Sequence, residues 1–169
     1  MILRDGVLAG TAVVVAGAGE LASAVAGRAA ALGARVSERA VDPRGEEAPF
    51  DGAADVLVYH AGEGMQAALD GAWLAIRPVA TAAMIGHGGG LIVLLAPRPG
   101  GPEAEAARAG LENLARTLSV EWARFEVRPV AILPGDATSP AEVAELVAFL
   151  ASPAGGYYSG CAFTMGAAA

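Results

Sequence analysis

Residues 13–36, VVVAGAGELASAVAGRAAALGARV, decide the fold of this chain. The stretch opens with a short run of valines, which is typical of a strand buried in a parallel sheet. Apolar residues then recur at helical spacing over residues 20–32, and Gly33 follows where a helix would end. A second strand is expected over residues 34–38. Strand, helix and strand in this order form one parallel β-α-β unit.

The same alternation continues to the end of the chain. We expect strands at residues 11–16, 34–38, 55–59, 90–96, 128–133 and 161–165, and helices at residues 20–32, 65–84, 103–125 and 140–150. Ser139 and Glu142 form a capping box for the last helix, and Pro78 is expected to kink or shift the second. Apolar strands alternating with amphipathic helices predict a doubly wound, mainly parallel α/β sheet of about six strands with helices on both faces. The length suits a single domain over residues 1–169.

The composition excludes several kinds of chemistry. All 11 basic residues are arginine, so no lysine amine exists for a Schiff base or a phosphate clamp. A net charge of −7 argues against nucleic acid as a partner. Residues 78–97 are uncharged but carry a glycine cluster at residues 86–90, which argues against a membrane span. With the single Cys161 and no secretory cleavage pattern after Arg4 and Asp5, a cytoplasmic location is expected.

A glycine turn follows the first strand. Gly17 and Gly19 open the helix in the way that a dinucleotide-binding turn does, where backbone amides approach a pyrophosphate. The later glycines of that motif are missing, and Glu20 places a carboxylate at the helix start. Two interpretations stay open: a tight turn filled by its own acid, or a weak nucleotide site at Gly17 and Gly19.

Six segments of the chain carry a resemblance to a known family: residues 13–36, 55–62 (DVLVYHAG), 88–96 (GGGLIVLLA), 107–128 (ARAGLENLARTLSVEWARFEVR), 130–135 (VAILPG) and 142–166. Together they resemble the short-chain dehydrogenase/reductase family. The resemblance implies a Rossmann sheet, NAD or NADP as the cofactor, and an Asn-Ser-Tyr-Lys catalytic set. It also implies that this domain is truncated and its fold reduced, because only about sixteen residues join the second and third strands and each crossover needs about a dozen.

Every catalytic position that the resemblance implies is substituted. Ala104 stands at the tyrosine position, Arg108 at the lysine position, Ala96 and Pro97 at the serine position, and Ala68 at the asparagine position. Ketone reduction of this type needs a phenol that protonates the substrate oxygen and a cation that lowers the phenol's pKa. We therefore expect no catalytic residues, no metal, and no cofactor beyond weak NAD(P) binding. His60 is interpreted either as a hydrogen-bonded structural residue or as a replacement acid or base.

The parts that are kept suggest an assembling subunit. The resemblance implies oligomer contacts through helices 65–84 and 103–125 and through the C-terminal helix and strand. Large side chains available there are Trp73, Trp122, Phe125, Tyr157 and Tyr158, with ordinary burial as the alternative. Three functions stay open: a non-catalytic subunit that pairs with itself or with an active paralogue, a weak NAD(P)-binding module, and an oxidoreductase with a non-standard active site.

Overall fold

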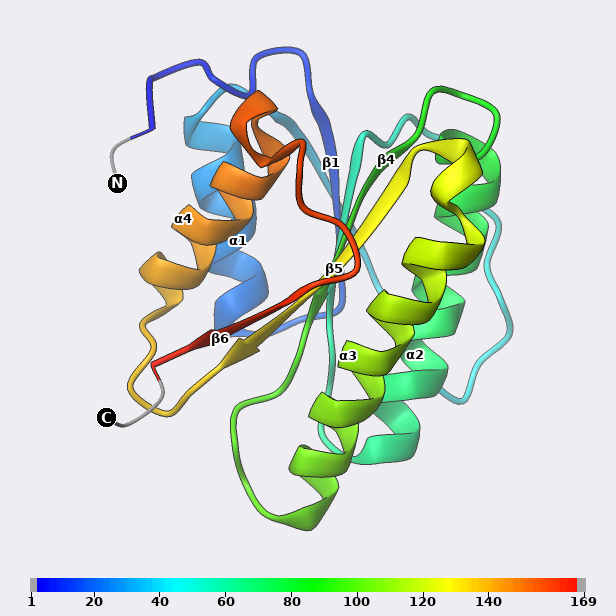
Figure 1. Ribbon diagram of the computed structural model, residues 1–169, viewed down its shortest axis with the longest axis vertical. Coiled ribbons are helices and arrows are strands. Elements are labelled where there is room, and N and C mark those ends of the chain that lie inside the picture. Colours follow the sequence, from blue (N-terminus) through cyan, green and yellow to red (C-terminus); the bar gives the residue numbers. More distant parts are fainter. Residues whose placement is uncertain (1–2, 167–169) are drawn as a thin grey trace.

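The computed structural model describes residues 3–166 and contains one six-stranded sheet between two pairs of helices (Figure 1). The strand order is β2-β1-β3-β4-β5-β6, and every neighbouring pair is parallel. The strands are β1 (Ala12–Ala16), β2 (Arg35–Arg39), β3 (Val56–His60), β4 (Gly90–Leu95), β5 (Val127–Pro134) and β6 (Ala162–Met165). The helices are α1 (Glu20–Ala31), α2 (Met65–Val79), α3 (Pro102–Glu121) and α4 (Pro140–Ala151). This architecture confirms the predicted doubly wound α/β sheet.

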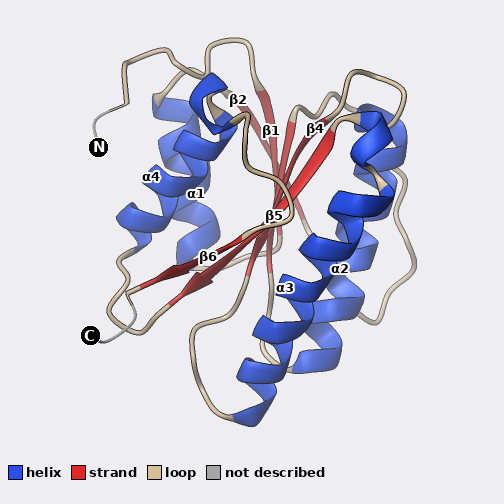
Figure 2. Cartoon of the chain, in the orientation of Figure 1, coloured by secondary structure: helices blue, strands red, loops and turns tan. Residues whose placement is uncertain are grey.

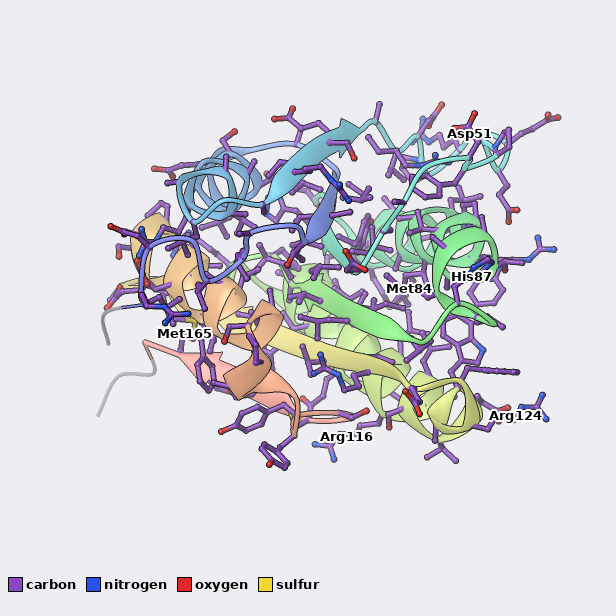
Figure 3. The ribbon with its side chains drawn as sticks, turned by 90° about the horizontal axis from the view of Figure 1, so that it is seen from above. Asp51, Met84, His87, Arg116, Arg124 and Met165 are labelled. Atoms are coloured by element: carbon purple, nitrogen blue, oxygen red, sulfur yellow. The ribbon has the colours of Figure 1, made fainter. Side chains whose placement is uncertain are left out.

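The helices cover the sheet in pairs. α1 and α4 lie against one face and α2 and α3 against the other (Figure 2), and the view from above shows the sheet running between the two pairs (Figure 3). Alternate residues of β1 serve the two faces: Val13 and Val15 pack toward α1 and α4, whereas Val14 and Ala16 pack toward α2 and α3. Side chains on successive strand residues point to opposite faces, so a strand covered on both sides is apolar throughout.

The predicted helices begin and end close to the expected positions. Ser139 Oγ accepts a hydrogen bond from the Glu142 amide and the Glu142 carboxylate accepts one from the Ser139 amide, which completes the predicted capping box. The predicted helix 65–84 is two pieces, because α2 ends at Val79 and a π-helical segment occupies Ala80–Met84. Pro78 lies just before the change. Its ring lacks an N–H and so removes one α-helical hydrogen bond.

The predicted helix 103–125 also divides. α3 ends at Glu121, and a 3₁₀ turn covers Ala123–Phe125. Glu126 then reverses the chain with a φ of 60°, the left-handed conformation that only this non-glycine residue adopts between residues 3 and 166. Within the same range, no helix combines the length and the apolar character that crossing a membrane requires.

Strand β2 differs from the expectation of uniformly buried strands. It is an edge strand, and Arg35, Ser37 and Glu38 are exposed on it. Charged residues on an edge discourage pairing with another chain. The segment between Arg39 and Val56 forms no helix or strand, as its length predicted. It is held to β2 by the Arg39 guanidinium, which donates to the carbonyl oxygens of Ala48 and Pro49 and lies 6.0 Å from the centre of the Phe50 ring.

Candidate functional site

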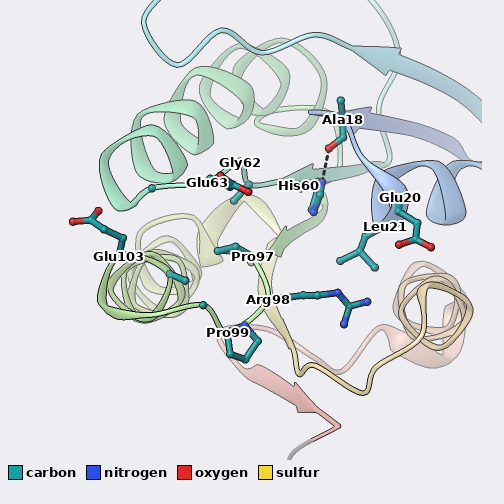
Figure 4. Close-up of a pocket in the computed structure, with 14 residues that line it drawn as sticks. Ala18, Glu20, Leu21, His60, Gly62, Glu63, Pro97, Arg98, Pro99 and Glu103 are labelled. Atoms are coloured by element: carbon teal, nitrogen blue, oxygen red, sulfur yellow. Dashed lines mark hydrogen bonds between the residues drawn. The ribbon is translucent and has the colours of Figure 1, made fainter.

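A cavity of about 770 Å³ lies at the carboxyl ends of β1, β3 and β4 (Figure 4). From β1 the chain crosses to β2 on one side and then to β3 on the other, so this edge contains the point where the strand order reverses. Ligands of open α/β sheets bind at such points. Its walls come from the start of α1, the segment after β3, the segment after β4 and the start of α3; they include Glu20, His60, Glu63, Pro97, Arg98, Glu103 and Ala104.

His60 covers the glycine turn at one end of this cavity. Gly17 and Gly19 have φ angles of 94° and 122°, which side-chain-bearing residues rarely adopt. A Cβ atom on Gly17 would collide with the His60 carbonyl oxygen, and one on Gly19 would lie 3.0 Å from Cε1 of the His60 ring. The ring Nδ1 lies 2.7 Å from the Ala18 carbonyl oxygen. Because Gly17 and Gly19 have no side chains, His60 can pack directly against the backbone of this turn.

The protonation of His60 follows from this arrangement. A carbonyl oxygen only accepts, so Nδ1 carries the proton and Nε2 is the free acceptor of the neutral ring. Burial lowers the pKa of His60 below its ordinary value, and the hydrogen bond to Ala18 offsets part of that effect. Burial thus favours the neutral form of the imidazole. The hydrogen bond agrees with the structural interpretation of His60.

The cavity rim is acidic. Glu20, Glu63 and Glu103 line it, and Arg98 is its one lining cation among the described residues. A dinucleotide pyrophosphate needs open backbone amides and no competing negative charge at the helix start. Here the His60 ring lies over Gly19, and Glu20 occupies the first turn of α1. The residues at this turn do not fit a pyrophosphate.

Arg108 joins the carboxyl ends of two strands and is not one of the residues that line the cavity. It is 9% exposed, and its Nη1 donates to the carbonyl oxygens of Pro97 at 2.8 Å and Pro134 at 2.7 Å. Pro97 follows β4 and Pro134 ends β5, so one guanidinium group holds the carboxyl ends of both strands together. Its Nε lies 3.7 Å from the exposed Glu105 carboxylate. The Arg108 guanidinium is therefore engaged by backbone carbonyl oxygens.

Arg98 makes a second bridge beside the first. Nη1 donates to the carbonyl oxygen of Gly135 at 2.6 Å and Nη2 donates to that of Thr138 at 2.7 Å. These residues belong to the short turn between β5 and α4. The Arg98 side chain extends from the segment after β4 and lines the cavity (Figure 4). Pairing of Arg98 with this turn was not expected from the sequence, because its partners lie about 40 residues further along the chain.

The remaining predicted positions divide between the cavity and the core. Ala104 and Pro97 line the cavity, whereas Ala68 and Ala96 are completely buried. The Tyr59 hydroxyl donates to the Ala68 carbonyl oxygen at 3.1 Å. Burial, and next the nearby Asp70 carboxylate, raise the pKa of Tyr59 to about 12. This phenol is thus a packed core group and not a cavity acid.

Comparison with known proteins agrees with this topology. No protein-family model and no curated protein sequence matches the chain. Among solved structures, the citronellol catabolism dehydrogenase of Pseudomonas aeruginosa is 27% identical with a TM-score of 0.83, covering 96% of each chain. A short chain dehydrogenase from Mycobacterium smegmatis is 26% identical with a TM-score of 0.83, covering 99% of this chain and 96% of that one. The chain has the short-chain dehydrogenase fold.

A third solved structure extends the likeness at the level of the fold. The hydroxysteroid dehydrogenase of Escherichia coli is 20% identical with a TM-score of 0.80, covering 95% of this chain and 97% of that one. In the short-chain dehydrogenase fold of this chain, Ala104 and Arg98 line the cavity at the strand ends. No three His, Cys, Asp or Glu side chains among residues 3–166 lie close enough together to hold a metal ion.

Proposed function

We propose that this chain is a non-catalytic subunit with a short-chain dehydrogenase fold, which assembles with itself or with an active paralogue. The observation that carries the proposal is the Arg108 bridge. The residue expected at the lysine position is buried and donates to the Pro97 and Pro134 carbonyl oxygens. The guanidinium group therefore links two segments that lie 11 and 26 residues from it in the sequence, and it holds the ends of β4 and β5 together.

The other expected catalytic positions support the same function. Ala104 faces the cavity without a proton to donate, and Ala68 and Ala96 are buried in the core. Carbonyl reduction gains its acid catalysis from a group that lies within hydrogen-bond reach of the substrate oxygen. Tyr59, the phenol nearest to this region in the fold, is 3% exposed and donates to Ala68. We infer that the cavity lacks a general acid for a ketone.

The exposed large side chains mark two faces for assembly. On α2, Met65 is 40% and Trp73 44% exposed; beyond α4, Tyr157 is 95% and Tyr158 37% exposed. Trp122 and Phe125 contribute less than the sequence suggested, because both are partly buried against the core beneath α2 and α3. Exposed aromatic side chains are the residues that most often anchor interfaces. The α2–α3 face and the C-terminal edge are therefore the proposed contacts.

Two measurements test the function together. The chain is expressed alone and together with each active short-chain dehydrogenase found in its source genome, and light scattering after size exclusion gives the stoichiometry. A fixed complex, with turnover of NADH or NADPH and carbonyl substrates only when the paralogue is present, is expected. A stable monomer that binds no copy and no paralogue contradicts assembly. Turnover by the purified chain contradicts the non-catalytic function.

The position of the cavity favours two alternative functions, a weak NAD(P)-binding module and an oxidoreductase with a non-standard active site. The cavity lies at the switch point of the sheet, where this fold class binds ligands, and the free Nε2 of His60 belongs to its wall. Calorimetric titration with NADH and NADPH tests binding. A turnover assay of wild type against His60→Ala tests catalysis: equal rates, or no rate in either, rule out His60 as the acid or base.

A further inference from the structure

We propose that His60 is a built-in occupant of the glycine turn, which closes the phosphate-facing end of the cavity, and that removing its ring opens the turn to a pyrophosphate-bearing ligand. The inference rests on the proposed non-catalytic function and adds a physical reason why the turn at Gly17 and Gly19 does not fit a pyrophosphate. It concerns the turn at Gly17 and Gly19 and makes no use of the assembly faces.

The sheet register places His60 at the turn. β1 and β3 are neighbouring parallel strands in which Ala16 lies opposite Tyr59, so the next residues, Gly17 and His60, also face each other. A Cβ on Gly17 would meet the His60 backbone oxygen, and a Cβ on Gly19 would meet the ring. The space that two glycines leave open at a helix start is thus filled from the adjacent strand end.

The ring is attached by a single hydrogen bond. Nδ1 lies 2.7 Å from the Ala18 carbonyl oxygen, and Nε2 has no hydrogen-bond partner among residues 3–166. One side of the ring faces the cavity of about 770 Å³ (Figure 4). Truncating the side chain at Cβ therefore extends an existing cavity and leaves no sealed hole in the core. The cost to folding is small compared with truncation of a core residue.

Glu20 is a second obstacle of a different kind. It lies in the first turn of α1 with its carboxylate in solvent, where it suits the positive end of the helix and repels a phosphate. The other charged groups around the cavity are Glu63 after β3, Arg98 after β4 and Glu103 on α3. His60 acts by occupying volume and Glu20 by charge, so variants separate the two effects.

The experiment is a two-by-two set: wild type, His60→Ala, Glu20→Gln and the double variant. NADH and inorganic pyrophosphate are the probes, titrated by calorimetry at low salt. We expect no heat with wild type or with Glu20→Gln at millimolar ligand, and measurable binding with His60→Ala. The double variant is expected to bind about two- to fivefold more tightly than His60→Ala, since a single carboxylate at a helix start contributes at that level. His87→Ala, which changes an exposed histidine, is the control.

Three results overturn the proposal. The first is a wild-type chain that binds NADH as tightly as the double variant. The second is Glu20→Gln binding as well as the double variant, because charge alone would then close the turn. The third is a folded His60→Ala that binds neither probe, alone or with Glu20→Gln. His60→Ser repeats the test if the alanine variant loses its circular dichroism. Light scattering measures assembly in a separate experiment, which tests the proposed function independently of the role of His60.

Discussion

Arg108 is expected to contribute strongly to stability. Replacing it with alanine leaves the buried carbonyl oxygen of Pro134 and the half-buried one of Pro97 without a charged donor, and such a loss costs about 3 kcal/mol of unfolding free energy. Arg108→Lys is expected to recover only part, because one ammonium replaces a planar, branched donor. Urea unfolding followed by tryptophan fluorescence measures both variants.

Arg116→Ala is the matched control for Arg108. It lies on the same helix and pairs with Glu112 at 2.6 Å, but its side chain is 59% exposed. Exposed pairs of this spacing contribute about 0.5 kcal/mol or less. If Arg108→Ala and Arg116→Ala lower the stability equally, the bridge between β4 and β5 has no special importance.

Tyr59 gives the fold a dependence on alkaline pH. Its pKa rises from 10.0 unfolded to about 12 folded, so the protonated phenol stabilises the native state fully below pH 10. Between these two values the unfolded state loses its proton first, and the unfolding free energy is expected to fall by about 1.4 kcal/mol per pH unit. Tyr59→Phe should remove this slope. Unfolding midpoints measured from about pH 9 to about pH 12 test it, and an unchanged slope in Tyr59→Phe contradicts it.

At the scale of elements, the segment between β2 and β3 has its own attachment. Arg39 donates to Ala48 and Pro49 and lies over Phe50, while Glu47 pairs with Arg77 of α2 at 2.8 Å. Arg39→Ala is expected to speed amide exchange across residues 40–54 at least about tenfold, since local opening loses these contacts. Arg35→Ala, at the exposed start of the same strand, should leave that exchange unchanged. Equal exchange in both variants contradicts this role for Arg39.

The elements themselves were largely predictable from local patterns. The valine run 13–15, the periodicity of α1 and the Ser139–Glu142 capping box all act within a few residues, and each formed as expected. The π-helical segment after Pro78 and the exposed β2 edge depend on packing and strand order, which no short window contains. For the same reason His60 could be named as a candidate, whereas its place over Gly19 required the register of β1 and β3.

For the whole molecule, variants on the two exposed aromatic faces can show which face carries self-association. Trp73→Asp places a charge on the α2–α3 face, and Tyr157→Ser removes the most exposed ring at the C-terminal edge. If the α2–α3 face carries self-association, Trp73→Asp should lower the mass in solution about twofold and Tyr157→Ser should not. The opposite pattern assigns assembly to the C-terminal edge. Light scattering at several concentrations decides, and two unaffected variants contradict both faces.

The Arg108 bridge also limits how this sequence can change. A change of Arg108 to lysine weakens the link between β4 and β5 and supplies no acid, since Ala104 lacks a phenol. Marginal stability makes such a step costly, because a few kcal/mol is a large share of what holds a domain folded. The single substitution Arg108→Lys is therefore expected to give a less stable chain. The structural role of Arg108 alone therefore favours arginine at this position, whatever the protein's activity.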